Sequence, residues 1–342
     1  MTLLYVDGFD NGDFASRWVV TQAGLTISAV TTTPFGAGKG LQRISASGGG
    51  NNSLMKKTIT ASAQVQIGFW FQFADVAHAA NVILAQVMAD SGAVVHAGLG
   101  LNGTNGTLFV FRGTIATVLA SGTTQFNPGQ WYFVEFKTTI ADSGGIANVV
   151  VSGSSEISFT GDTRNAGTST NIDTVQLWGT AGTNVQMLLD DIYIANGLGS
   201  VNNDFLGAMR IQTLNPNAAG TDSGLTTTGS ANHYANVSDQ TTTTYNASPT
   251  ATTRDSYALP DLAGTTASIF GIQTVMAAQN SDAGAGSMKA VVRSGGTNYY
   301  DATQVLSASI VYSAVVRETD PATSAAWTVT NVNALQVGAE VV

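Results

Sequence analysis

Apolar and polar residues alternate in short runs along much of this 342-residue chain. In the first part of the chain each run is bounded by Gly, Asn, Asp or Ser, and this spacing is typical of the strands of a β-sandwich rather than of alternating strands and helices. The runs cover residues 66–73, 82–88, 94–101, 107–112, 131–140, 147–151, 173–178 and 185–194.

Residues 74–90 also fit a second interpretation. Val76, Ala80, Ile83 and Val87 lie nearly on one helical stripe, so a helix is an alternative for this segment. Strand patterns flank the segment on both sides, and they favour two strands joined by a loop at residues 78–81.

A linker-like stretch divides the chain into two patterned segments. Residues 197–206 contain Gly197, Gly199 and several Asn or Asp residues after a strongly apolar run, which is the composition of a linker or turn. Alternation then resumes at 205–214, 256–259, 268–277, 287–293, 304–317 and 335–341, and the polar stretch 221–249 is predicted to be an extended loop. We therefore predict an all-β protein with two β-sandwich, jelly-roll-like domains, residues 1–198 and 199–342.

Charge and composition narrow the classes of partner. Charged residues make up 10% of the chain, against roughly 25% in ordinary soluble domains. The net charge is −9, and the 5 Lys and 8 Arg form no basic cluster, so neither nucleic acid nor an anionic membrane surface is an expected partner. No apolar run reaches the roughly 18 residues of a membrane span. The absence of Cys excludes disulfides and thiolate metal sites.

The beginning of the chain carries no basic residue before Asp7 interrupts its apolar run. This pattern predicts no signal peptide and therefore synthesis in a cytoplasm.

Calcium is the one cofactor that the carboxylates suggest. Asp7 and Asp10 lie in a run of acidic and Asn residues, and Asp190 and Asp191 form a second group. Hard oxygen ligands suit Ca²⁺, but the spacing does not match an EF-hand loop, and an Asx-rich turn explains the first run equally well. These four residues are the candidate calcium ligands, and no other cofactor is predicted.

The sequence predicts no catalytic residues. Glycoside hydrolysis needs two carboxyl groups about 5–10 Å apart, and the only close pair with a Glu, Glu318 and Asp320, reads as a strand end that enters a Pro turn. His78, His96 and His233 match no nucleophile signature. The chain is therefore predicted not to be an enzyme.

A carbohydrate-binding face is a further candidate. By strand alternation, Trp70 and Gln72 share one sheet face with Glu135 and Lys137 if the intervening phenylalanines point into the core. An aromatic ring beside hydrogen-bonding groups suits a sugar. The alternative, which we favour, is that loops or a neighbouring subunit cover both faces of the sheet.

Several segments resemble known families. The segments YVDGFD (residues 5–10), GQWYFVEF (129–136) and LDDIYI (189–194) occur in this order and together resemble the concanavalin A-like (LamG-like) jelly-roll superfamily. The segments GSVNNDFLG (199–207), ETDP (318–321), AWT (326–328) and NALQVG (333–338) are similar to tailed-bacteriophage virion proteins, in which a lectin-like jelly roll precedes a second β-sandwich.

The resemblance implies a function that the residues alone do not. It implies a non-enzymatic structural protein on the surface of a bacteriophage particle, in the tail, baseplate or fibre or as a head decoration, made and assembled in the host cytoplasm with other virion proteins as partners. The alternative is a carbohydrate-binding adsorption module that recognises host surface glycans. An unusual glycan hydrolase is a third reading, although the acidic signature of the superfamily's glycosidases has no counterpart here.

The C-terminal segment has the composition of a buried surface. Residues 256–317 contain only Lys289, Arg293 and Arg317 as cationic groups, and no Glu occurs in them. Unpaired sheet edges with so few charges pack readily against a neighbour. The sequence therefore predicts a homo-oligomer, with a trimer favoured, that forms mainly through this segment; a monomer kept soluble by Thr and Asn is the alternative.

Overall fold

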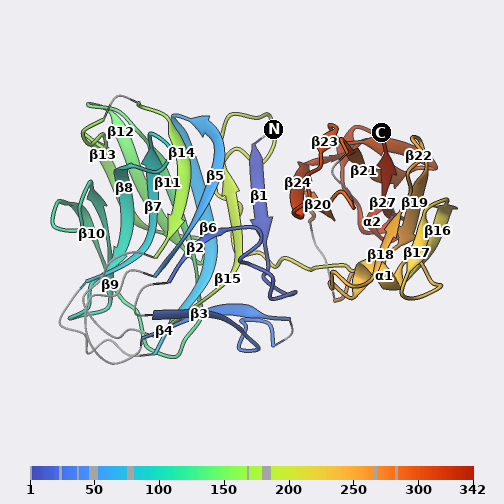
Figure 1. The fold of residues 1–342 in the computed structure, drawn as a ribbon. Helices are drawn as coiled ribbons and strands as arrows, with labels where there is room; N and C mark the ends of the chain where they lie inside the picture. Colours follow the sequence, from blue (N-terminus) through green and yellow to red (C-terminus); the bar gives the residue numbers. More distant parts are fainter. Residues whose placement is uncertain are drawn as a thin grey trace. The chain divides into compact units, whose positions relative to one another are not determined.

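The computed structural model describes residues 2–22, 25–36, 38–45, 53–74, 81–167, 169–178, 186–264, 268–281 and 284–342. The chain divides into two compact units, Met1–Ile211 and Gln212–Val342 (Figure 1). Both units are built from antiparallel strands, which confirms the predicted all-β class of two jelly-roll-like sandwiches. The described residues contain two short helices, α1 (Ala235–Ser238) and α2 (Val329–Asn333), and no helix there is long and apolar enough to cross a bilayer.

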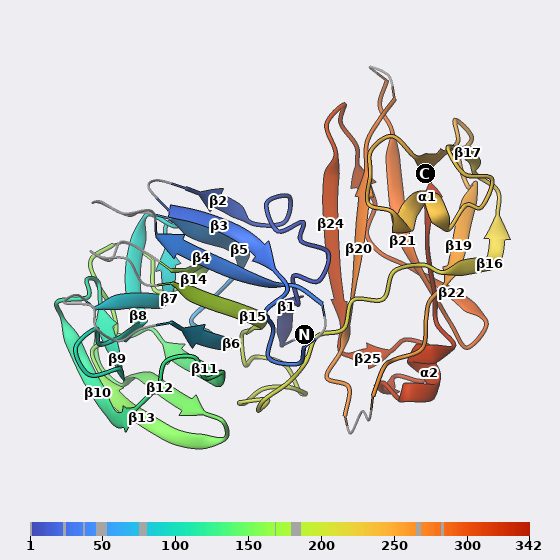
Figure 2. The same ribbon diagram turned by 90° about the horizontal axis from the view of Figure 1, so that it is seen from below.

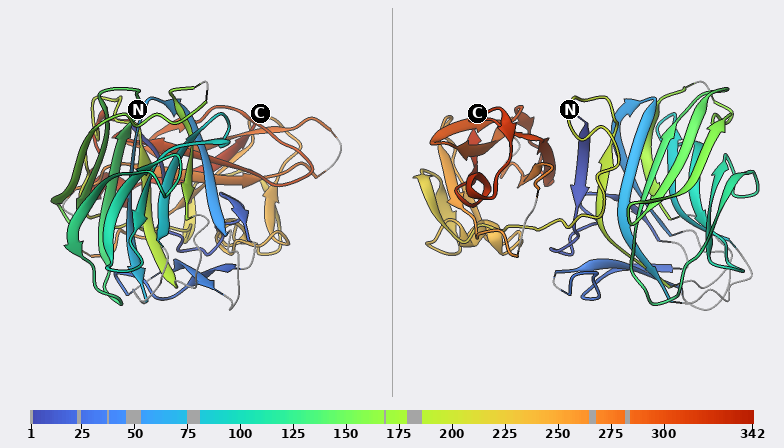
Figure 3. Two further views of the ribbon diagram at one scale, coloured as in Figure 1. Left: turned by 90° about the vertical axis from the view of Figure 1, so that its left-hand side faces the viewer. Right: turned by 180° about the vertical axis from the view of Figure 1, so that it is seen from behind.

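The first unit is a sandwich of two sheets, which form two layers in Figure 2. The larger sheet has eight strands in the order β13-β12-β11-β6-β15-β4-β3, and β1 pairs with β15 off this path. Its hairpin β12–β13 forms one edge and is green in Figure 3. The bounds are β1 Leu3–Asp7, β3 Leu25–Val30, β4 Gly40–Ser45, β6 Gln64–Phe73, β11 Tyr132–Thr139, β12 Gly145–Val151, β13 Ser154–Gly161 and β15 Met187–Ala195.

The second sheet of this unit has seven strands in the order β10-β9-β8-β7-β14-β5-β2. The bounds are β2 Val19–Thr21, β5 Leu54–Ser62, β7 Val82–Ala89, β8 Val94–Leu101, β9 Thr107–Arg112, β10 Val118–Gln125 and β14 Ile172–Leu177. Strand β7 shows that the second part of the segment 74–90 is a strand and not a helix; residues 75–80 lie outside the described residues.

The core of the first unit lies between the two sheets and follows from strand alternation. Phe69, Phe71 and Phe73 of β6 point inward together with Val134 and Phe136 of β11, as the sequence pattern predicts. Full burial of such a side chain contributes about 1.5–3 kcal/mol. The residues between them therefore face outward, which fixes the side of the sheet on which the predicted sugar-binding residues lie.

The first unit extends beyond the residue at which the sequence pattern divided the chain. The sequence placed the boundary between residues 198 and 199, whereas the compact unit continues to Ile211. Residues 205–214 were predicted to form a strand, but they form none. Within this stretch, the backbone N–H groups of Leu206, Gly207 and Ile211 donate to carboxylates of the first sandwich instead of to a neighbouring strand.

The second unit has a six-stranded sheet in the order β16-β19-β27-β21-β22, with β23 paired to β21. Three two-stranded pieces accompany it: β17–β18, β20–β24 and β25–β26. Its core joins Val292 to Trp327 and Leu335, with Ile272 packed against them. The bounds are β16 Ala218–Ser223, β17 Thr226–Thr228, β18 Tyr245–Ala247, β19 Arg254–Ala258, β20 Ile272–Ala278, β21 Ser287–Ser294, β22 Thr297–Tyr300, β23 Gln304–Val305, β24 Val311–Arg317, β25 Thr319–Asp320, β26 Ala325–Ala326 and β27 Gln336–Val341.

The polar stretch 221–249 is more ordered than the extended loop that the sequence predicts. It contains the β17–β18 pair and the helix α1. Asparagine side chains hold it together: the Asn236 carboxamide accepts from the Ser230 N–H, and Asn246 donates to the His233 carbonyl. Hydrogen bonds from side-chain amides to the backbone hold these elements, and such bonds require no alternation of apolar residues. The hydrophobic pattern therefore did not predict them.

Candidate functional site

The four residues predicted to bind sugar lie on the outer face of the eight-stranded sheet. Trp70 pairs with Phe133 across β6 and β11. Glu135 and Lys137 follow on the same face of β11, and Gln72 on that of β6. The structure therefore brings these residues to one face, as predicted.

A tyrosine from β15 fills the centre of that face. The ring of Tyr193 lies over Gly68, where any side chain would clash with it, and it stacks on Phe133 with centroids 6.5 Å apart. The Tyr193 hydroxyl donates to Glu135 Oε1 at 2.6 Å. Burial and the adjacent Glu135 carboxylate raise the pKa of Tyr193 well above its usual value, so the hydroxyl keeps its proton.

Residues 204–211, which we call the strap, cover the same face. The N–H groups of Leu206 and Gly207 both donate to Glu135 Oε1, at 2.7 and 3.0 Å. Trp70 Nε1 donates to the Met209 carbonyl at 2.8 Å, and Lys137 pairs with Asp204 at 3.1 Å. The strap is therefore anchored to three of the four predicted sugar-binding residues.

The fourth residue is also engaged by the chain. Gln72 Nε2 donates to the Gly129 carbonyl at 2.8 Å. Glu135 is only 1% exposed, and Trp70 packs edge-on against Phe35 and Phe133. This surface therefore matches the alternative of a covered face. The strap, a segment of the same chain, covers it.

Asp7, the first candidate calcium ligand, is occupied by its neighbours. Its carboxylate accepts from the Tyr5 hydroxyl, Trp18 Nε1 and the Phe9 N–H at 2.9–3.0 Å. It also pairs with Arg17 at 3.2 Å. These contacts tie the start of the chain to the sandwich, as expected for an Asx-rich turn.

Asp190 and Asp191 are buried side by side on β15. Desolvation, followed by the charge of Asp191, raises the pKa of Asp190 to about 9. Desolvation also raises the pKa of Asp191 to about 7, although the hydrogen bond that its carboxylate accepts from the Ile211 N–H lowers this pKa. Asp10 adds to both shifts through its charge. In the part of the chain that the structure describes, no three acidic or histidine side chains gather in a way that could hold a metal ion. Calcium binding by the four predicted residues stays a prediction.

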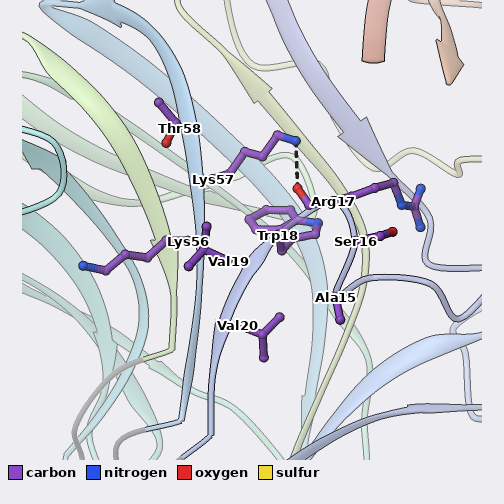
Figure 4. Close-up of a pocket in the computed structure, with 9 residues that line it drawn as sticks. All are labelled: Ala15, Ser16, Arg17, Trp18, Val19, Val20, Lys56, Lys57 and Thr58. Carbon is purple, nitrogen blue, oxygen red and sulfur yellow. Dashed lines mark hydrogen bonds between the residues drawn. The ribbon is translucent and has the colours of Figure 1, made fainter. Parts of the chain in front are cut away.

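An open cleft lies at the edge of the seven-stranded sheet, beside β2 and β5 (Figure 4). Its volume is about 450 Å³, which is within the range of small-molecule sites. Trp18 is its buried base, and Val19 on the edge strand is 66% exposed. The residues that line the cleft are Ala15, Ser16, Arg17, Trp18, Val19, Val20, Lys56, Lys57 and Thr58.

Three of the chain's cationic side chains line this cleft. Lys56 and Lys57 leave β5 on opposite sides, as consecutive strand residues must, and Lys57 Nζ donates to the Arg17 carbonyl at 2.9 Å (Figure 4). Lys57 also lies 3.8 Å from the centre of the Tyr5 ring, and burial lowers its pKa to about 8. Arg17 Nη2 is buried and has no hydrogen-bond partner among the described atoms, while Arg17 Nη1 pairs with Asp7. Lys56 Nζ donates to the Gly92 carbonyl at 3.0 Å. Within the described residues, the two lysines are therefore the cations of the cleft that pair with carbonyls and not with a carboxylate.

The three histidines have different positions. His96 is buried between two backbone groups: its Nδ1 accepts from the Asn165 N–H and its Nε2 faces the Ser169 carbonyl. Burial lowers the pKa of His96, so the ring is a neutral structural group. His78 lies outside the described residues. His233 contacts a serine and an aspartate of the second unit.

The comparisons with known proteins identify no family. A scan against family models finds no match, and a search of curated proteins finds no relative. Among solved structures, the chain is similar to a cellulose-induced protein, with 14% identity, a TM-score of 0.45 and coverage of 60% of this chain and 100% of that one.

Two further solved structures are also similar to this chain. One is a protein of unknown function with a galectin-like fold from Bacillus subtilis, at 10% identity, a TM-score of 0.42 and coverage of 57% of this chain and 96% of that one. The other is a carbohydrate esterase from the Shiga toxin-encoding bacteriophage phi24B, at 15% identity, a TM-score of 0.39 and coverage of 57% and 98%. Binding proteins and enzymes share such folds, so the likeness assigns neither a ligand nor a reaction.

Proposed function

We propose that the protein binds an acidic carbohydrate in the cleft beside β2 and β5, as the recognition module of a particle or surface protein. One observation carries the proposal: Arg17, Lys56 and Lys57 line a cleft of about 450 Å³ in a chain whose net charge is −9. Carboxylate or sulfate groups of a sugar would give the lysine ammonium groups a charged partner in addition to the backbone carbonyls to which they now donate.

The rest of the molecule supports this location. On the outer face of the eight-stranded sheet, three hydrogen bonds and one ion pair join Trp70, Glu135 and Lys137 to the strap. A ligand would have to break these contacts before it could bind there. In the cleft, Val19 and the stems of the lysines provide apolar surface for a sugar ring. The host-surface glycan predicted from the resemblance becomes, on this basis, a negatively charged one.

Binding to defined oligosaccharides tests the proposal. Titration calorimetry with polyuronate oligosaccharides should give saturable binding, and neutral glucan oligosaccharides of the same length should give none. Lys57→Met should weaken binding at least about tenfold, because it removes one charge-assisted hydrogen bond. Binding should also weaken above pH 8, since Lys57 loses its proton there.

A matched lysine provides the control. Lys137 is also partly buried in the first unit but pairs with Asp204 of the strap, so Lys137→Met should leave binding unchanged. Equal affinity for charged and neutral sugars, or equal loss in both variants, would contradict the proposed site.

Assembly through the second unit is a second candidate function, and the β20–β24 pair favours it. Among the described residues these strands pair only with each other, Val275 on β20 is 44% exposed, and Arg317 is their one charged residue. Such an edge is a template for pairing with another chain. This would suit the trimer and the place in a bacteriophage particle that the sequence predicts.

Oligomeric state tests this second candidate. Light scattering on the full chain should give a trimer, and Val275→Lys, which places a charge on the exposed strand, should give monomers of unchanged fold. A wild-type monomer at tens of micromolar would count against assembly through this edge, without bearing on the cleft.

A further inference from the structure

Three residues of the second unit form a chain of contacts that the sequence analysis did not connect. Ser223 Oγ lies 3.3 Å from His233 Nε2, and His233 Nδ1 lies 2.6 Å from Asp255 Oδ2. The serine is exposed and the aspartate is fully buried. The order of serine, imidazole and buried carboxylate is that of a nucleophile, its base and the group that orients the base.

The fold brings these residues together through strand register and a pinned loop. Ser223 ends β16 directly opposite Asp255 on β19. His233 reaches them from the loop before α1, where Asn246 Nδ2 donates to its carbonyl at 2.9 Å. The three residues therefore come from two strands and a loop, at separations of 10 and 22 positions along the chain.

The hydrogen bonds of Asp255 fix the tautomer of the His233 ring. Its Oδ1 accepts from the Leu225 N–H at 2.9 Å, and its Oδ2 accepts from the Tyr257 hydroxyl at 3.1 Å. An ionised carboxylate only accepts hydrogen bonds, so His233 Nδ1 carries the proton that points to it. In the neutral ring, Nε2 then carries a lone pair directed at the Ser223 hydroxyl. This is the tautomer that a general base needs.

A small cavity opens beside the serine. Its volume is about 230 Å³, and Ser223, His233, Asn232 and Tyr257 are among the residues that line it. This is below the usual range for drug-sized ligands, so it accommodates only a small group. Asn232 is exposed and lines this cavity, so its carboxamide offers an uncharged N–H donor there.

We propose that Ser223, His233 and Asp255 form a hydrolytic site for esters of short carboxylic acids. Ser223 Oγ attacks the ester carbonyl carbon while its proton passes to His233 Nε2, and the tetrahedral intermediate forms. The C–O bond to the alcohol breaks, and the alcohol leaves with the proton from His233, which leaves an acyl-serine. Water then gives its proton to His233, attacks the acyl carbon, and the acid leaves as the serine recovers its proton.

Each residue has a distinct role in this proposal. Ser223 and His233 are the catalytic residues. Asp255 is a positioning residue that acts through the His233 ring, and the Asn232 carboxamide donates to the oxyanion. The small cavity selects an acyl group near the size of acetyl, so p-nitrophenyl acetate should react at least about tenfold faster than p-nitrophenyl octanoate, since the longer chain has no room.

A covalent serine probe gives the direct test on the full chain. A fluorophosphonate probe should label one serine, and mass spectrometry of the peptides should place the label on Ser223. Ser223→Ala should abolish labelling and lower p-nitrophenyl acetate hydrolysis at least about 100-fold. Because Ser223 is exposed, thermal unfolding of this variant should match the wild type, and Ser248→Ala, a serine outside the cavity, should retain both label and rate.

Chemical rescue separates catalysis from a structural contact. His233→Ala should lose activity, and added imidazole should restore part of it in this variant but none in Ser223→Ala. Asp255→Asn should lower kcat with little change in KM. Wild-type hydrolysis no faster than that of Ser223→Ala, a label on another residue, or a His233→Ala variant that imidazole does not rescue would overturn the assignment. Acidic-sugar binding at the first unit is measured separately and is not affected by any of these outcomes.

Discussion

On the outer face of the eight-stranded sheet, Glu135 accepts three hydrogen bonds from the chain itself: one from Tyr193 and two from the strap. In the cleft beside β2, Lys56 and Lys57 each donate to a backbone carbonyl, and Arg17 pairs with Asp7. Both regions are polar surfaces of one sandwich with a tryptophan beside them. A segment of the chain covers the carboxylate of the first region, whereas the lysines of the second lie beside an open cleft, so polar composition alone does not identify a site.

Removal of the tryptophan under the strap should have the largest effect. Trp70→Ala deletes the contacts with Phe35 and Phe133 and the hydrogen bond to the Met209 carbonyl. Loss of so large a packed side chain should lower the free energy of unfolding by about 3 kcal/mol, measured by urea denaturation. Affinity for acidic oligosaccharides should be unchanged; a folded variant of normal stability that has lost sugar binding would show that the covered face is the site.

Glu135→Gln should have the next largest effect. The amide keeps the size of the side chain but weakens the charge-assisted bonds to the Leu206 and Gly207 N–H groups. We expect a loss of about 2 kcal/mol, together with faster hydrogen exchange of residues 204–211. Glu156→Gln on β13, whose carboxylate bonds to exposed Thr124, is the control. Unchanged exchange of the strap would mean that other contacts hold it.

The buried pair on β15 should make stability depend on pH. The pKa of Asp190 is about 9 in the folded chain, against 3.8 for the unperturbed group. The folded state therefore binds more protons between these values, and the free energy of unfolding should fall as pH rises through this window. Asp190→Asn should be more stable than the wild type at pH 8 and equal to it near pH 4, because the amide does not titrate; urea denaturation at the two pH values measures the difference.

Calcium binding would contradict the interpretation of Asp190 and Asp191 as structural residues. If millimolar Ca²⁺ raised the melting temperature of the wild type at pH 8, and Asp190→Asn abolished that rise, the acidic residues would be ligands after all. Without such a rise, Asp190 is a protonated structural residue at this pH and not a ligand.

Lys57→Met should have the smallest effect on stability and so sharpens the contrast between the two regions. Burial already disfavours the charged form of Lys57, and the methionine keeps the contact with the Tyr5 ring. The free energy of unfolding should change by less than about 1 kcal/mol. A loss as large as that of Trp70→Ala would mean that the cleft, like the covered face, is part of the folding core.

The sequence determined most of the strands and the direction of their side chains. The alternation in β6 and β11 placed the phenylalanines inward and Trp70 and Glu135 outward, because a strand's period of two follows from backbone geometry alone. Likewise, the low charge and absence of cysteine limited the classes of partner before any fold was known. The small structured pieces of residues 221–249 escaped notice because side-chain amides, and not apolar periodicity, hold them.

Only the tertiary structure decided what lies against the outward residues. The strap reaches Glu135 from 71 and 72 positions further along the chain, and Asp255 meets His233 through the register of β16 with β19. Period-two patterns record on which side of a sheet a residue lies, but not which distant segment will supply its hydrogen bonds. That choice depends on the geometry of the whole fold, since a buried carboxylate must find donors wherever the packed chain brings them.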